Sequence, residues 1–308
     1  MQQQAALTVA GIALTLLCFL GATQLGPTGA MLNFLTPLPV SYLSLRFGLR
    51  TGVMVVGVTG LVLGMLIPFY SLVTYFGLFG VGSLLLPYLL KRRIAWDQAA
   101  AVTVGAVTIA ALLLVGSYLL ASDESLGVLL DQYLQAELDL AVQAYQDAGL
   151  TGPELEQMKE IAGQVADFIR STFFGLYLAG ALAVQLLTLV LLNRFKADHY
   201  QISGVPFVRW RLPALLIWPL ILAGFALLVP QQHLQLVARN ALALLLPLYF
   251  LQGLAVVSNF LQRKAFPPLL KGMIYLMVFI FNPLPLIVTG VGVFDLWIDF
   301  RRPRKKDF

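Results

Sequence analysis

The chain has 308 residues, of which 59% are apolar and 11% are charged, and its mean hydropathy is +0.84. A soluble domain carries about 25% charged residues, so this composition excludes a soluble protein and predicts a membrane protein of several helices. The formal net charge of +5 does not indicate nucleic-acid binding, because the basic residues are spread between apolar runs, where anionic lipid headgroups are the nearer partner.

Nine apolar regions are long enough to be considered for crossing a bilayer core of about 30 Å. The first lacks the preceding basic residues and the small-residue cleavage pattern of a signal peptide, so we expect a retained helix. The nine regions lie at residues 5–25, 30–45, 51–69, 71–90, 98–121, 171–192, 212–229, 238–260 and 268–300.

Basic residues are concentrated in every second loop, which predicts the orientation. Twelve lysines and arginines lie in these loops, whereas the intervening loops hold only Lys159, Arg170 and Arg239. Short loops rich in lysine and arginine stay in the cytoplasm, so the twelve-residue side and the N-terminus are predicted inside. The C-terminal tail adds five basic residues and is predicted on the same side, so the number of crossings is even.

The last apolar region is interrupted at Asn282-Pro283-Leu284-Pro285, where prolines lack an N–H for the helix ladder. Two short helices joined there as a tight hairpin give ten crossings, with both termini cytoplasmic. Eight crossings, with one of the shorter segments re-entrant, satisfy the charge distribution as well.

Residues 122–170 form the one large polar insertion and hold ten of the 15 acidic residues. Apolar side chains recur there at helical spacing, which predicts one amphipathic helix ending at Gly149 and a second beginning near Pro153. The two are expected to pack together as an external hairpin, which either forms a solvated lid or docks a partner. The chain thus divides into N-terminal membrane helices (1–121), this hairpin, and C-terminal membrane helices with a basic cytoplasmic tail (171–308).

Uncharged polar residues and helix breakers gather in the first 90 residues. Pro37 and Pro39 interrupt the second apolar region, and broken helices that expose backbone dipoles recur in solute-binding membrane proteins. The alternative is that the prolines kink an ordinary helix and the tyrosines anchor it at the interface. The candidate solute-binding residues are Asn33, Thr36, Tyr42, Tyr70, Thr74 and Tyr75.

Asp295 and Asp299 lie four residues apart on one predicted helix face, beside Trp297 and near the cytoplasmic boundary. Like charges on one face repel each other, so the pair needs basic partners, and Arg209 or Arg211 lies on the correct side. An interfacial ion network would fix the last helix, and losing one carboxylate would cost about 1 kcal/mol, as for exposed pairs. The other interpretation is a cytoplasmic contact site for a partner protein.

The remaining chemistry-bearing residues indicate neither an enzyme nor a bound cofactor. Cys18 has no partner cysteine, and His199 and His233 are far apart, so neither a disulfide nor a metal site is expected. Phosphate-binding glycine loops and hydrolase nucleophile motifs do not occur in the sequence. Acidic residues and histidines are missing from the middle of the apolar regions, which argues against proton-coupled transport.

Three segments resemble the YybS-like family of uncharacterised bacterial multi-pass membrane proteins. They are residues 206–213 (PFVRWRLP), the stretch from Asn240 that ends in LQGLA at 251–255, and residues 292–301 (GVFDLWIDFR). The resemblance covers essentially the whole chain and implies a polytopic protein of the bacterial cytoplasmic membrane without naming a reaction. The family-motif residues are Arg209, Trp210, Arg211, Pro213, Asn240, Gln252, Asp295, Trp297, Asp299 and Arg301.

The N-terminal half is similar, more distantly, to the S components of energy-coupling-factor transporters. Pro37-Leu38-Pro39, followed by Phe47-Gly48 and Gly52, carries this resemblance. S components have six helices and bind a small solute from outside, while separate subunits hydrolyse ATP. The present chain departs from them in its additional helices and in the insertion at 122–170.

The sequence therefore predicts an all-α, polytopic helical membrane bundle of about 8 to 10 crossings with an external amphipathic helical hairpin. The expected function is a solute-binding or transport component without its own ATPase, whose partners are anionic lipid headgroups, a small-molecule solute and a membrane or external protein. The alternative is a non-transporting scaffold or assembly factor that binds partners through the hairpin or the basic tail. A polar, aromatic-lined cavity would favour solute binding, and an exposed apolar patch on the hairpin would favour scaffolding.

Overall fold

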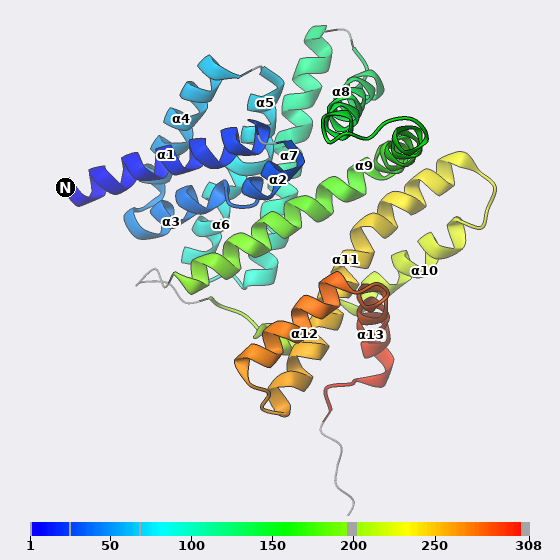
Figure 1. The fold of residues 1–308 in the computed structure, drawn as a ribbon. Coiled ribbons are helices and arrows are strands. Elements are labelled where there is room, and N and C mark those ends of the chain that lie inside the picture. The colour runs from blue at the N-terminus through cyan, green and yellow to red at the C-terminus, as the bar shows by residue number, and fades with distance from the viewer. Residues whose placement is uncertain (1, 25, 68, 123, 196–201, 303–308) are drawn as a thin grey trace, which may run out of the picture. The chain divides into compact units, whose positions relative to one another are not determined.

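The computed structural model describes residues 2–24, 26–67, 69–122, 124–195 and 202–302, which form helices and connecting turns without a strand (Figure 1). In chain order the helices are α1 (Gln2–Gln24), α2 (Gly26–Asn33), α3 (Pro37–Phe47), α4 (Leu49–Leu66), α5 (Phe69–Thr74), the π-helical turn η1 (Tyr75–Gly80), α6 (Val81–Lys91), α7 (Trp96–Ser122), α8 (Leu126–Asp147), α9 (Pro153–Arg194), the 3₁₀ turns η2 (Phe207–Arg209) and η3 (Ala214–Leu216), α10 (Ile217–Ala226), α11 (Gln232–Arg263), α12 (Pro268–Ile280) and α13 (Leu284–Ile298).

Within the described residues, six helical stretches are long and apolar enough to cross a membrane, or up to seven if the bent pair α12 and α13 forms one span. This number is below the eight to ten crossings expected. The helices α10, α12 and α13 have 10, 13 and 15 residues. At about 1.5 Å per residue, each is shorter than a hydrocarbon core of about 30 Å.

The predicted break at Asn282-Pro283 is present, and α12 and α13 meet there at an angle of 102°. The bend replaces the tight hairpin expected from the prolines. It leaves α12 largely exposed, with Val278 as its buried residue, so this pair presents most of its apolar side chains to the surroundings.

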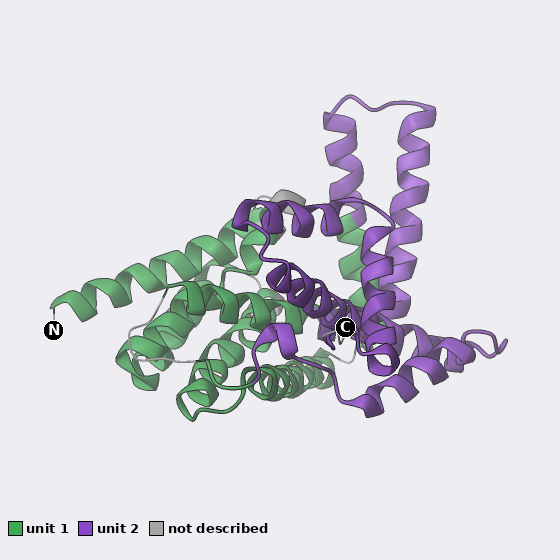
Figure 2. Cartoon of the chain, turned by 90° about the horizontal axis from the view of Figure 1, so that it is seen from below, with its two compact units in different colours: residues 1–137, 180–204 green, residues 138–179, 205–308 purple. Residues whose placement is uncertain are grey.

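Packing divides the chain into two compact units (Figure 2). Unit 1 comprises residues 1–137 and 180–204, and unit 2 comprises residues 138–179 and 205–308. Their boundaries fall inside α8 and α9. These units are defined by packing, whereas the three regions predicted from the sequence are defined by polarity.

The core of unit 1 is centred on aromatic side chains from α1 and η1. Phe19 lies edge-on to Tyr75 and Phe79, with ring centroids 5.6 and 6.1 Å apart, and Val184 of α9 joins the same cluster. Around it, α3 packs against α1, α4 and α6. Unit 1 thus gathers α1, α2 with α3, α4, α5 to α6, α7, the N-terminal part of α8 and the C-terminal part of α9.

The prolines of the second apolar region begin a helix and do not kink one. Pro37 is the first residue of α3, where a missing N–H costs nothing. The chain turns through residues 34–36 before it. At the other end Gly48, with a φ of 100°, turns α3 into α4.

The two helices expected in residues 122–170 are present as α8 and the N-terminal part of α9, joined by a turn in which Gly149 has a φ of 88° (Figure 2). The expected mutual burial of their two apolar stripes is not found in the side chains. Tyr145 is 37% exposed, Ile161 is 45% exposed and Val165 is 50% exposed. The hairpin therefore keeps an apolar stripe on its surface.

In unit 2, α11 is the central helix and packs against α10, η2 and α13. Its approach to α13 depends on Gly253 and Gly292, because a Cβ at either position would overlap a backbone carbonyl oxygen of the other helix. Glycine permits such close backbone contact because it has no Cβ to hold the two helices apart.

Candidate functional site

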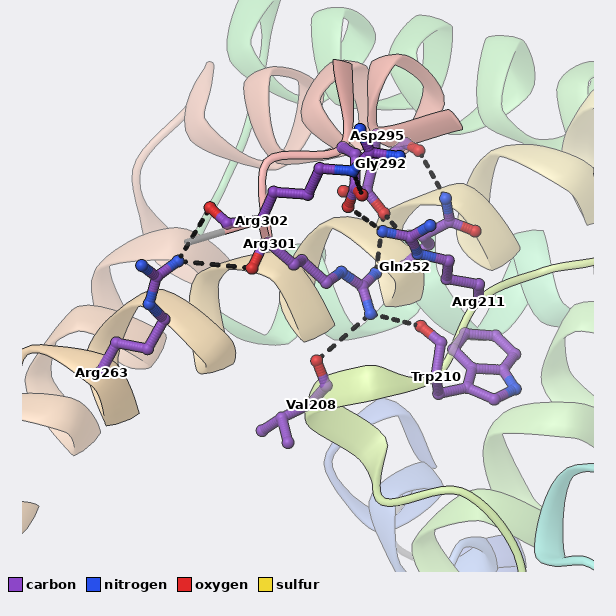
Figure 3. Close-up of polar contacts among 10 residues, drawn as sticks. Val208, Trp210, Arg211, Gln252, Arg263, Gly292, Asp295, Arg301 and Arg302 are labelled. Atoms are coloured by element: carbon purple, nitrogen blue, oxygen red, sulfur yellow. Dashed lines mark hydrogen bonds and ion pairs between the residues drawn. The ribbon is translucent and has the colours of Figure 1, made fainter. Parts of the chain in front are cut away.

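A buried ion pair lies at the C-terminal end of α13 (Figure 3). The Nη2 atom of Arg301 is 3.0 Å from Oδ2 of Asp295, and their side chains are 7% and 0% exposed. Arg211, which is half-exposed, places its Nε atom 3.6 Å from the same carboxylate oxygen. A lone charge at this depth would be costly, so each side chain compensates the charge of the other.

A left-handed turn at Asp299 produces this pair. The helix α13 ends at Ile298, and Asp299 has φ 48° and ψ 64°, while its N–H donates to the Asp295 carbonyl. Aspartate is among the few residues that adopt this conformation. On a continuous helix, a residue six positions beyond Asp295 would lie about 120° away around the axis and more than one turn further along, so the turn is what brings Arg301 back to Asp295.

The Arg301 guanidinium also holds a second segment of the chain. Its Nη1 donates to the carbonyl oxygens of Val208 and Trp210, at 3.2 and 2.7 Å. Burial lowers the pKa of Arg301, and the Asp295 carboxylate opposes that shift. The ordinary pKa of an arginine is so far above neutral pH that the guanidinium stays charged.

Gln252 of α11 connects the third segment. Its Oε1 accepts a hydrogen bond from the Leu212 N–H, and its Nε2 donates to the Gly292 carbonyl, both at 2.9 Å. The side chain is 2% exposed. A single buried carboxamide therefore ties the segment after η2 to α13.

The outer side of the cluster is formed by Asp299, which accepts hydrogen bonds from Arg211 and from Nε of Arg302, the latter at 2.6 Å. Burial alone would raise the pKa of Asp299, but the hydrogen bonds and charges of Arg211 and Arg302 lower it below its ordinary range. Arg263, at the end of α11, donates to the carbonyls of Arg301 and Arg302 at 3.4 Å. No sequence signal distinguished Arg263 from other loop arginines.

All three family-motif segments thus meet at one place, which we call the charge cluster: Arg211, Gln252, Asp295, Asp299 and Arg301, together with the main chain of Val208, Trp210 and Gly292. Its acidic and basic groups bind each other and the backbone. The charge cluster therefore fixes the C-terminal end of α13 against α11 and the segment around η2.

The other family-motif residues lie around or away from the charge cluster. Arg209 and Pro213 belong to the segment that the cluster holds, and both are exposed. The Trp210 ring stacks near Phe207 at 6.4 Å between centroids. Trp297 is 59% exposed on α13.

Asn240 lies at a different place in unit 2, where α11 crosses α9. Its Nδ2 donates to the Ser171 carbonyl, and its Oδ1 accepts from the Gly175 N–H, both at 2.9 Å. Ser171 and Gly175 are four residues apart, so the carboxamide bridges the two backbone groups that a helix normally joins directly. Asn240 is a wedge that fixes α11 against α9.

The candidate solute-binding residues of unit 1 lie on several different elements. Thr36 is buried and donates to the Leu32 carbonyl at 3.4 Å. The Tyr42 hydroxyl accepts a hydrogen bond from Arg46 at 2.9 Å. Thr74 is exposed at the end of α5.

Tyr75 is the candidate that reaches the core of unit 1, being 1% exposed. Asn33, which is partly buried, has a buried Oδ1 without a hydrogen-bond donor among the described residues. Tyr70 lies in α5, but its side chain is outside the described residues.

Sequence reasoning missed a set of buried neutral polar side chains in unit 1. Gln185 of α9 is 0% exposed, and neither atom of its carboxamide has a hydrogen-bond partner among the described residues. The Thr103 hydroxyl is likewise buried without a partner among the described residues, whereas the buried hydroxyls of Thr59 and Tyr75 lie within hydrogen-bonding reach of each other; all three residues are 1% exposed or less. Gln185 is the one carboxamide residue between 171 and 192, and that isolation was the available signal.

Gln185 lies against α6, at Gly82. A Cβ on Gly82 would overlap the Nε2 atom of Gln185, so the glycine provides the room that the carboxamide occupies. Tyr75 and Thr59 have neighbouring hydroxyl groups on η1 and α4. Single π-helical turns inside α-helices occur frequently at functional sites.

A family model described as "Predicted membrane protein (DUF2232)" matches residues 13–296 of the chain. No curated protein matches it. No solved structure matches it either. The family match covers segments of both compact units and includes Gln185, Asn240, Gln252 and Asp295.

Proposed function

The chain belongs to the DUF2232 family of predicted membrane proteins, and from this premise we propose that it is a solute-binding component of a membrane transport system. The proposal places it in the bacterial cytoplasmic membrane with both termini inside. The observation that carries it is the unpaired carboxamide of Gln185 in the interior of unit 1.

Burying an unpaired polar group costs about 1 to 3 kcal/mol, and buried polar groups in native proteins almost always have partners. Gln185 offers two donors and an acceptor, the Thr103 hydroxyl offers one donor, and the neighbouring hydroxyls of Thr59 and Tyr75 leave one further donor after pairing with each other. A solute that pairs with such groups would recover this cost on binding. Because all four are neutral, the proposed solute is an uncharged molecule with hydrogen-bonding groups.

Two features of the backbone of unit 1 support the proposal. The π-helical turn η1 carries Tyr75, and α2 and α3 are separated by a turn at residues 34–36. Interrupted helices in membrane proteins are tolerated where the irregular backbone is buried in protein or lines a cavity. The sequence resemblance of the N-terminal half to S components, which bind a small solute, is consistent with this proposal.

We propose no enzymatic activity for the chain itself. The sequence has no phosphate-binding glycine loop, so the energy for transport would come from a separate protein. Basic side chains such as Arg46, Arg50 and Arg92 are exposed in unit 1 and suit contact with anionic headgroups or with that partner at the cytoplasmic face.

The test is native mass spectrometry of the purified full chain, with Gln185→Met as the diagnostic variant. Methionine is a flexible, apolar side chain of similar length, so the substitution removes two unpaired polar groups without a large cavity. We expect retention of a small molecule by the wild type, a loss of at least about tenfold in the variant, and no fall in the thermal midpoint of the ligand-free protein.

Thr188→Val is the matched control on the same helix. Thr188 is equally buried, but its hydroxyl already donates to the Val184 carbonyl at 2.8 Å, so solute retention should not change. Equal retention by wild type and Gln185→Met would contradict the proposal, as would a wild-type protein that carries no small molecule from its native membrane.

One observation favours a scaffold or assembly factor as the second candidate. The hairpin of α8 and α9 leaves apolar side chains exposed, including Ile161 and Val165, as expected for a surface that binds another protein. Charge substitutions at these two positions would then remove a co-purifying protein while leaving small-molecule retention intact. The same mass-spectrometry experiment separates the two functions.

A further inference from the structure

Unit 2 contains a cleft of about 490 Å³ that is separate from the charge cluster and from the interior of unit 1. Three segments form its walls, and its volume lies within the range of about 300 to 1,000 Å³ usual for small-molecule sites. The lining residues are Asp167, Phe168, Ser171, Leu227, Gln235 and Arg239.

Two carboxamides fix the walls of this cleft. Asn240 bridges the backbone of α9 at Ser171, which belongs to the cleft lining. Gln235 donates from its Nε2 to the carbonyls of Leu227 and Val229, at 3.3 and 3.0 Å, and so holds the end of α10 to α11. The cleft is therefore already shaped before any ligand enters, which lowers the entropic cost of binding.

An acidic residue of α9 and a basic residue of α11 line the cleft but do not form an ion pair with each other. Asp167 and Ser171 lie one turn apart on α9, and Gln235 and Arg239 lie one turn apart on α11. The ion pairs among the described residues include neither Asp167 nor Arg239. A carboxylate and a guanidinium that share a cleft but do not pair are complementary to a molecule carrying both charges.

We propose that the cleft binds a zwitterion composed of a primary ammonium and a phosphate. Arg239 would take the phosphate, because a guanidinium fork matches phosphate oxygens with two parallel hydrogen bonds. Asp167 would take the ammonium, a compact triple donor. The Gln235 Oε1 is available to accept a further hydrogen bond from it.

The position of the cleft indicates a lipid as the source of this group. Asp167 directly precedes the apolar stretch at 171–192, so the cleft lies at the level where headgroups begin. Phe168, in the cleft wall, is 58% exposed and offers an apolar surface to acyl chains. The headgroup chemistry required is that of phosphatidylethanolamine.

The experiment measures lipid retention by the full chain in native mass spectrometry after exchange into equal mixtures of phosphatidylethanolamine, phosphatidylcholine and phosphatidylglycerol. We expect preferential retention of phosphatidylethanolamine, since phosphatidylcholine lacks ammonium N–H donors and phosphatidylglycerol lacks the cation. Asp167→Asn and Arg239→Gln should each reduce that preference by about tenfold, the effect of one charged hydrogen bond. Asp167→Glu, which keeps the charge, should retain most of it.

Glu154→Gln and Lys159→Gln are the controls, because they remove one acid and one base from the exposed part of α9 outside the cleft. Both should leave lipid retention at the wild-type level.

A soluble competitor, glycerophosphoethanolamine, distinguishes the source: displacement of the lipid at micromolar concentration would reassign the cleft to a free solute. Equal retention of the three lipids, or a preference unchanged in both Asp167→Asn and Arg239→Gln, would overturn the proposal. Neither outcome depends on Gln185, so this test and that of the proposed function fail independently.

Discussion

Arg301 reaches back over the end of α13 to place its Nη2 atom 3.0 Å from Oδ2 of Asp295, in a site where the two side chains are 7% and 0% exposed. The sequence suggests Arg209 or Arg211 as the basic partner, and of these Arg211 is present, but more distant at 3.6 Å and half-exposed. The principal partner is therefore the buried Arg301. Burial changes the energetics, because an uncompensated charge there cannot be solvated.

The first prediction is that Asp295→Asn destabilises the protein by about 3 to 5 kcal/mol, the cost of leaving one partner of a buried pair uncompensated. This replaces the figure of about 1 kcal/mol expected for an exposed pair. The free energy of unfolding in detergent is the measurement, and Asp299→Asn, on the exposed side of the cluster, should cost about 1 kcal/mol or less. A similar small loss for both variants would show that the pair contributes as a surface bridge does.

The second prediction concerns acid stability. The pKa of Asp299 is lowered in the folded protein by Arg211 and Arg302, against the opposing effect of burial, so the unfolded chain binds the proton more readily. The stabilising contribution of Asp299 is then complete well above about pH 3.9, the ordinary aspartate value, and is lost as the pH falls below it toward the folded pKa. Thermal midpoints of wild type and Asp299→Asn should differ at about pH 6 and converge as the pH falls through the folded pKa of Asp299. A difference that grows on acidification would contradict this sign.

The third prediction tests the close approach of α11 and α13. In Gly292→Ala the new Cβ would overlap the Tyr249 carbonyl oxygen, so we expect a loss of about 1 to 3 kcal/mol or more from overpacking. Gly290→Ala is the control on the same helix, since nothing lies within 4 Å of its Cβ position. There alanine should be neutral or stabilise by about 0.5 to 1 kcal/mol through helix propensity. Equal effects of the two substitutions would mean that the helices can separate without cost.

Much of the fold was predictable because it follows from long apolar runs and from prolines and glycines. The helix over 2–24, the break at 282–283 and the start of α9 at Pro153 all follow local rules. The crossing number is harder to predict, because a run of apolar residues does not reveal how it is divided: residues 30–45 contain parts of two helices separated by a turn. Tertiary packing, which sequence periodicity does not contain, decides such divisions.

The charge cluster was predictable in its members and not in its pairing. Asp295, Asp299 and Arg211 could be linked from the sequence, because two acidic residues on one helix face need basic partners. Arg301 pairs with Asp295 only because Asp299 adopts a left-handed conformation, which the sequence pattern does not reveal. In unit 1, attention to proline and tyrosine identified Tyr75 and missed Gln185. Burying a neutral carboxamide in an apolar run costs less free energy than burying a charge. A sequence search for residues that are costly to bury therefore overlooks it more easily.

The fourth prediction is topological. With 17 of 20 basic residues on the inner side, Gln146 at the tip of the hairpin is expected outside and Lys264 after α11 inside. Both positions are exposed, so cysteines placed there in a Cys18→Ser background should react with an impermeant thiol reagent in intact cells at Gln146→Cys alone. Lys264→Cys should become reactive after permeabilisation. The reverse pattern would invert the whole assignment.

The fifth prediction addresses the wedge at Asn240, whose carboxamide bridges the Ser171 carbonyl and the Gly175 N–H. In Asn240→Leu these two backbone groups can bond directly, as residues four apart in a helix do, so the loss should be modest. We expect about 0.5 to 1.5 kcal/mol, in line with interhelical hydrogen bonds in membrane proteins. The measurement is the free energy of unfolding in detergent.

Gly175→Ala should lower the free energy of unfolding more than Asn240→Leu does. Its new Cβ would overlap the backbone carbonyl of Asn240, which cannot move aside as a flexible side chain could. Gly180→Ala, five residues further along α9 with nothing within 4 Å of its Cβ position, is the control for helix propensity. If Asn240→Leu proved as costly as Gly175→Ala, α9 could not restore its own hydrogen bond. The carboxamide would then be an obligatory part of that helix, and the cleft beside Ser171 would be lost with it.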